Sequence, residues 1–172
     1  MKKYFLIAFT LCSIGALAQE KTAYKTTRQF SITGAIKKES VITMDSLNSY
    51  ALKEIGDIKV TDHVGNFKHG DDKLKGVLLK DILSHSQLAA SSPKLFSQFY
   101  FVCTGSDGYK VVYSWNELFN TPVGDNVYIL MEKNGVKADK LPESLQMASM
   151  LDMKTGRRYL HNLDKIIVQQ AP

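Results

Sequence analysis

The chain has 172 residues, of which 44% are hydrophobic and 23% charged, with 22 Lys and Arg against 17 Asp and Glu. These values are ordinary for a packed globular protein, and they exclude collagen-like, mucin-like and wholly disordered chains. The length predicts one domain that is large enough to fold on its hydrophobic core alone.

Residues 1–18 have the pattern of a secretory signal peptide. Lys2 and Lys3 supply a positive start, residues 4–17 form an apolar run, and residues 16–18 (Ala-Leu-Ala) form a small-x-small cleavage site before Gln19. The run is shorter than the ~20 residues of a membrane-spanning helix, so we expect no membrane span. The sequence therefore predicts a soluble exported protein, periplasmic or secreted.

Removal of this signal changes the charge and the cysteine count. Without Lys2 and Lys3 the 22 basic residues become 20 against 17 acidic ones, and a net charge of +3 is too small to indicate a nucleic-acid partner. Cys12 leaves with the signal, so Cys103 has no intramolecular partner and no disulfide is expected. A free cysteine on an aromatic strand is either a thiolate ligand or a packed side chain, and we predict that Cys103 is packed.

The mature chain reads as strands interrupted by short helices. Residues 19–28 are a polar lead-in, and residues 29–170 form the single domain. We predict strands at 30–36, 55–60, 95–103, 109–113, 127–131, 159–160 and 166–168, a loop at 66–74, and short helices at 44–52, 76–83 and 115–119. Thr43 caps the first helix, a Ser114–Glu117 capping box opens the third, and Asn134-Gly135 predicts a type I′ hairpin. Because the strands do not alternate regularly with helices, we predict an α+β domain with mainly antiparallel or mixed sheets.

The sequence contains none of the common motifs of nucleotide-binding proteins, zinc proteases and serine hydrolases. His63 and His69 lie in a segment that also contains Asp62, Asp71 and Asp72, which offers nitrogen and oxygen ligands for a metal. Their spacing fits no recognised ligand pattern, and a solvated polar loop is expected to contain such residues in any case.

A basic segment near the end of the chain offers donors for a phosphate. It contains Arg157, Arg158 and His161 after a turn at Gly156, and an arginine side chain matches phosphate oxygens with two parallel hydrogen bonds. If the segment is an extended strand, Arg157 points away from Arg158 and contributes little. The alternative is an exposed basic hairpin without a ligand.

Several segments, in this order, resemble the molybdopterin-binding domain of the sulfite oxidase family, particularly its short exported bacterial members. They span nearly the whole mature chain. The segments are 30–36 with 42–47, which are similar to the entry strand and first helix; 76–83, similar to "GVPL..LL"; 106–109, similar to a "DGY" strand; 127–135, which ends in "NG"; and 156–168, similar to "GxRxxKxLxxIxV". The resemblance implies a β-rich mixed-sheet α+β fold with short helices.

The resemblance also implies a site. Arg158, His161, Asp107 and Tyr109 correspond to positions that bind the molybdopterin cofactor, and His63 stands where the catalytic members carry a molybdenum-ligating Cys. Imidazole is a neutral donor that does not replace the charge of a thiolate.

Two functions follow from these observations. The first is an exported molybdopterin-binding protein like the sulfite oxidase-type oxidoreductases, which needs a separate redox partner protein because the chain has no haem-attachment CxxCH motif. The second is a non-enzymatic module that keeps the fold without the cofactor and binds a small ligand or a partner.

Overall fold

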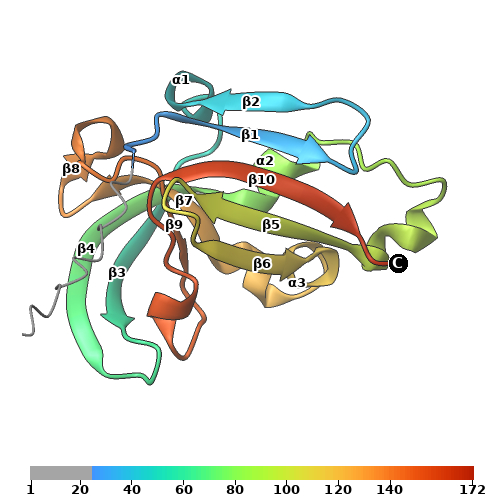
Figure 1. The fold of residues 1–172 in the computed structure, drawn as a ribbon. Helices are drawn as coiled ribbons and strands as arrows, with labels where there is room; N and C mark the ends of the chain where they lie inside the picture. The colour runs from blue at the N-terminus through green and yellow to red at the C-terminus, as the bar shows by residue number, and fades with distance from the viewer. Residues whose placement is uncertain (1–24) are drawn as a thin grey trace, which may run out of the picture.

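The computed structural model describes residues 25–172, so the predicted signal peptide and residues 19–24 lie outside it. Two five-stranded sheets form the domain (Figure 1). The first has the order β2 (Ser40–Thr43), β1 (Gln29–Gly34), β10 (Leu163–Gln170), β5 (Phe99–Gly105) and β6 (Lys110–Ser114). The second has the order β3 (Lys53–Thr61), β4 (Phe67–Leu78), β7 (Val127–Lys133) and β8 (Val136–Lys137), with β9 (Gln146–Ser149) also paired to β7.

The helices are short and connect the strands. The α-helices are α1 (Met44–Leu47), α2 (Leu79–Ser84) and α3 (Trp115–Phe119). The 3-10 helices are η1 (Pro93–Gln98), η2 (Pro122–Asn126), η3 (Ala138–Lys140) and η4 (Thr155–Arg157). Among the described strands β1 and β10 pair in parallel, and the other pairs are antiparallel. No helix within residues 25–172 has the length and apolar character needed to cross a membrane.

The main core lies between the two sheets. Alternate residues of β1, such as Phe30 and Ile32, point into it and meet Ile129 and Met147 from the second sheet within the same cluster. Cys103 belongs to this cluster and is fully buried, as predicted, and burial raises the pKa of its thiol to about 12. A thiol in this position packs as a small apolar side chain.

A smaller cluster packs around the second sheet. It contains Ile58 and Val60 of β3, Leu74 and Leu130 of the neighbouring strands, and the ring of Tyr159. Tyr159 thereby ties the segment after η4 to the β3–β4 hairpin. This contact positions the candidate site described below.

Several local predictions are confirmed. Thr43 caps α1 through a capping box with Ser46, although the helix ends at Leu47 and does not continue to residue 52. The box of Ser114 and Glu117 opens α3 at the predicted residues. Asn134 and Gly135 have φ angles of 54° and 73° between β7 and β8, as a type I′ turn requires.

Other local predictions are wrong. Residues 67–74 form part of β4 and not a loop, because they pair with β3 in a hairpin whose two faces are largely exposed, so polar side chains are tolerated there. The predicted helix at 76–83 starts at Leu79, since residues 76–78 are the buried end of β4 between β3 and β7. Residues 95–98 belong to η1, and Leu160 forms only an isolated bridge.

Candidate functional site

A cavity of about 450 Å³ opens between the β3–β4 hairpin, the turn before β6 and the segment that follows η4. Its volume is within the range of small-molecule sites. The lining residues are Val60, Thr61, Asp62, His63, Lys68, His69, Asp107, Tyr109, Gly156, Arg157, Tyr159 and His161.

The cavity brings together four of the five residues to which the sequence analysis gave a cofactor-binding or metal-binding role. His63, Asp107, Tyr109 and His161 all lie in its wall, although they come from three separate segments. Asp107 accepts a hydrogen bond from the backbone N–H of Tyr109 at 2.9 Å, which fixes the turn. These residues are therefore neighbours in space, as a shared site requires.

Arg158 does not line the cavity. Its guanidinium donates to Asp152 Oδ2 at 2.7 Å and to Glu117 Oε1 at 3.1 Å, and it lies over the ring of Tyr113 at 4.5 Å. The hydrogen bond to Asp152 is the main reason that the pKa of Arg158 is raised above its ordinary value. With both carboxylates in contact, the charge of Arg158 is already compensated inside the protein.

Arg157 lines the cavity, whereas the sequence analysis assigned ligand binding to Arg158. The prediction that Arg157 points away is wrong, because residues 155–157 form a 3-10 turn and not an extended strand. Its Nε and Nη2 donate to the backbone oxygen of His63 at 3.2 and 3.0 Å. The hydroxyl of Tyr109 donates to the backbone oxygen of Arg157 at 2.7 Å, so this side chain connects the turn before β6 to η4.

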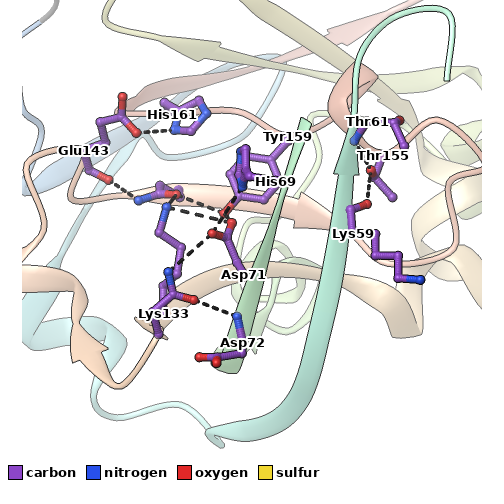
Figure 2. Close-up of polar contacts among 12 residues, drawn as sticks. Lys59, Thr61, His69, Asp71, Asp72, Lys133, Glu143, Thr155, Tyr159 and His161 are labelled. Atoms are coloured by element: carbon purple, nitrogen blue, oxygen red, sulfur yellow. Dashed lines mark hydrogen bonds and ion pairs between the residues drawn. The ribbon is translucent and has the colours of Figure 1, made fainter. Parts of the chain in front are cut away.

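The η4 turn is fastened to β3. Thr155 Oγ1 donates to the backbone oxygen of Lys59 at 2.7 Å and accepts from the N–H of Thr61 at 3.1 Å (Figure 2). A Cβ on Gly156 would lie 1.9 Å from the backbone oxygen of Thr61, so only glycine allows this approach. The position of Arg157 is thus set by its neighbours in the turn.

Two histidines of the cavity each have a carboxylate within ion-pair distance. His69 Nδ1 lies 3.4 Å from Asp71 Oδ1, and His161 Nδ1 lies 2.7 Å from Glu143 Oε2 (Figure 2). The ring of Tyr159 is close to both, with centroid distances of 5.0 Å to His161 and 6.5 Å to His69. A carboxylate on Nδ1 orients an imidazole and leaves Nε2 for a ligand.

A polar cluster around Asp71, which is 5% exposed, contacts the cavity through the lining residues His69 and Tyr159. The Tyr159 hydroxyl donates to Asp71 Oδ2 at 2.9 Å, and Lys133 Nζ lies 3.9 Å from the same oxygen. Lys133 also donates to Gln146 Oε1 at 3.0 Å. Such partners are needed because an unpaired carboxylate inside a protein is costly.

The protonation states follow from this environment. Burial is the main cause that lowers the pKa of His161 below 6.5, and Glu143 opposes it only in part. Burial and then Asp71 raise the pKa of Tyr159 well above its ordinary value. At neutral pH the cavity therefore presents a neutral imidazole at His161 and a protonated phenol at Tyr159.

The donors of the cavity do not match a thiolate-ligated molybdenum centre. None of its lining residues is a cysteine, and Cys103 is buried in β5 with its thiol protonated. Within residues 25–172 no three His, Cys, Asp or Glu side chains converge as metal ligands. Asp62, for example, accepts from the backbone of its own turn at Val64 and Gly65. The cations Arg157 and Lys68 nevertheless suit the phosphate group of a pterin cofactor.

Sequence reasoning missed the contributions of His69, Asp71 and Tyr159 to one cluster. His69 and Asp71 are two residues apart on β4, and Tyr159 and His161 have the same spacing after η4. Residues at i and i+2 share a face of a strand. The pair of His69 and Asp71 can therefore be recognised from the sequence if residues 67–74 are assigned to a strand.

Comparison with known proteins shows similarity at the level of the fold. The sequence matches no protein-family model and no curated protein. The structure is similar to sulfane dehydrogenase SoxCD from Paracoccus pantotrophus, with a TM-score of 0.59 and 12% sequence identity over 81% of this chain. The match covers 37% of that chain, so this protein corresponds to little more than a third of its length. The predicted fold class, a β-rich mixed-sheet α+β fold of the sulfite oxidase type, is confirmed.

Proposed function

We propose that this protein is an exported binding module that holds a small phosphate-bearing ligand in the cavity beside η4. The observation that carries the proposal is the contrast between two adjacent arginines. Arg158 contacts two carboxylates, whereas no carboxylate among residues 25–172 lies within ion-pair distance of Arg157 or of Lys68. Both of these uncompensated cations line the cavity.

The remaining wall suits the same ligand. His161 Nδ1 lies 2.7 Å from Glu143 Oε2, so Nε2 is the ring nitrogen that is farther from this carboxylate, and Tyr109 also lines the cavity. Arginine and lysine bind phosphate oxygens through charge-assisted hydrogen bonds, which are stronger than neutral ones. A neutral imidazole whose Nδ1 faces a carboxylate carries its proton on Nδ1, so Nε2 accepts a hydrogen bond from a protonated phosphate oxygen.

The pterin phosphate of molybdopterin is one ligand of this class, and the resemblance described above favours it. If this cofactor binds, Arg157, Lys68 and His161 are the residues that hold its phosphate, while the metal end has no thiolate. A molybdopterin-dependent oxidoreductase with a separate redox partner protein is the second candidate function. The specific observation in its favour is the shared fold with a dehydrogenase.

Calorimetric titration with a phosphorylated pterin and its dephosphorylated counterpart tests the binding proposal. We expect Arg157→Gln to weaken binding of the phosphorylated compound ten- to a hundredfold, because a hydrogen bond to a charged group contributes ~1.5–3 kcal/mol. The matched control is Lys154→Gln, which removes a charge three residues earlier that does not line the cavity. Equal affinities in the two variants, or equal affinity for the two compounds, would refute the phosphate site.

Metal analysis of protein purified from its native compartment separates the two functions. About one molybdenum per chain supports the oxidoreductase. Protein without molybdenum, and without pterin fluorescence after denaturation, supports the binding module, provided that the same host loads its other molybdenum enzymes.

A further inference from the structure

A second cavity, of about 530 Å³, is lined in part by the 85–98 segment. Figure 1 shows this segment, in yellow-green, on the opposite side of the molecule from the β3–β4 hairpin. The second cavity shares no lining residue with the first cavity. Its walls are the end of α2, the segment before η1, η1 itself and α3. The lining residues are Lys37, Leu83, Ser84, Ser86, Gln87, Leu88, Ala90, Ser91, Ser92, Pro93, Phe96, Trp115 and Phe119.

The loop that closes this cavity is held in place by backbone hydrogen bonds. The N–H of Lys37 donates to the oxygen of Gln87 at 2.8 Å, and the N–H of Ala89 donates to the oxygen of Ala35 at 3.0 Å. The Ser92 side chain caps η1 by accepting from the N–H of residue 94. The cavity is therefore formed before a ligand enters, as most small-molecule sites are.

Three aromatic rings make one wall. Trp115 stacks on Phe119 with a centroid distance of 5.4 Å and an interplanar angle of 21°. The centroid of the Phe96 ring lies 5.5 Å from that of Trp115, with an interplanar angle of 52°. The Leu83 side chain, which is buried, adds to the apolar surface. A flat apolar group that lies along these rings gains stacking and removes apolar surface from water.

The charge of the lining selects among apolar ligands. An aromatic wall by itself also attracts cations through the faces of its rings. Among residues 25–172, Lys37 is the one charged residue that lines the cavity, and no Asp or Glu lines it. A cationic ligand would meet an uncompensated like charge, whereas an anionic group placed at the rim would meet an opposite one.

We infer that this cavity is a second ligand site, independent of the phosphate site, that takes a planar apolar monoanion of the aromatic carboxylate class. The ring system lies against Trp115, and the carboxylate lies toward the ammonium group of Lys37. The serine and glutamine side chains around the rim supply further hydrogen-bond partners for the carboxylate.

The test uses 2-naphthoate, the neutral 2-naphthalenemethanol and the cation benzyltrimethylammonium as probes in calorimetric titrations. Trp115 is the chain's one tryptophan, so its indole N–H signal in NMR reports contact at this cavity without ambiguity. We expect 2-naphthoate to bind saturably at one site, to shift this signal, and to bind more tightly than the other two probes.

A pair of adjacent lysines provides the matched variants. Lys37→Gln should weaken the binding of 2-naphthoate about tenfold, because it removes one partly solvated charge. It should leave the affinity for the neutral probe unchanged. Lys38→Gln removes a neighbouring charge that does not line this cavity and should change neither affinity. The Arg157→Gln variant should bind 2-naphthoate as the unchanged protein does, so failure of the phosphate site leaves this result intact. Absence of saturable binding, tighter binding of the cation, or equal effects of the two lysine variants would overturn the inference.

Discussion

The polar cluster under the first cavity makes a quantitative prediction for Tyr159→Phe. This change removes the hydroxyl that donates to Asp71 at 2.9 Å and keeps the ring that packs in the smaller core cluster. Asp71 then retains His69 at 3.4 Å, Asn134 Nδ2 at 3.5 Å and Lys133 at 3.9 Å, which are longer contacts. A hydrogen bond to a buried charge contributes ~1.5–3 kcal/mol, so we expect the free energy of unfolding to fall by about 2 kcal/mol.

Urea unfolding at pH 7 measures this loss. With an m-value of about 2 kcal/mol per molar, the midpoint should move down by about 1 M while m stays unchanged. Tyr109→Phe is the control, because its hydroxyl also donates one hydrogen bond but the side chain is 44% exposed and water replaces the contact. We expect that control to lose less than about 0.5 kcal/mol. A Tyr159→Phe loss as small as that of the control would refute the assignment of Tyr159 as the main partner of Asp71.

Four further predictions follow from the structure and the sequence. In thermal unfolding, Arg158→Ala should lower the free energy of unfolding by about 3 kcal/mol, because it leaves the 11%-exposed carboxylate of Asp152 without its charged partner. Arg157→Ala should lower it by less than about 1 kcal/mol. Equal losses in the two variants would contradict the pairing of Arg158 with Asp152. Because the pKa of His161 is lowered in the folded state, the stability linked to its neutral form is progressively lost as the pH falls below about 6.5, and His161→Gln should flatten the unfolding free energy between pH 7.5 and 5. Cys103, whose thiol pKa is raised to about 12, should resist iodoacetamide at pH 8 until urea unfolds the chain, and rapid labelling of folded protein would disprove its burial. Intact mass of protein from the native host should correspond to a chain that begins at Gln19, and a mass that retains residues 1–18 would disprove cleavage.

Local signals in the sequence predicted the short-range features well. The capping boxes at Thr43 and Ser114 and the Asn134-Gly135 turn depend on residues within a few positions of each other, so the printed sequence contains their whole cause. The order of the motif-like segments predicted the fold class, although each segment alone is weak. The buried position of Cys103 followed from its place on an aromatic strand.

The predictions that were wrong concern residues whose interaction partners are distant in sequence. The polar first half of β4 is a strand because β3 pairs with it, and its composition alone favours a loop. Arg157 and Arg158 are adjacent and chemically equal, and their roles are decided by the η4 turn and by Glu117, which is 41 residues from Arg158. No local pattern distinguishes the arginine that has carboxylate partners from the one that lacks them.

The position of β10 in the first sheet has a consequence for the order of folding. This strand lies between β1 and β5, with Ser31 paired to Lys165, so it joins two strand pairs that have no other connection within the sheet. Until residues 163–170 arrive, β1 and β5 each present an unpaired edge, which is open to association with other chains. Contacts so distant in sequence also slow folding, because the loop must close before they form. A polypeptide that emerges in order from a ribosome therefore cannot complete this sheet until residues 163–170 are released.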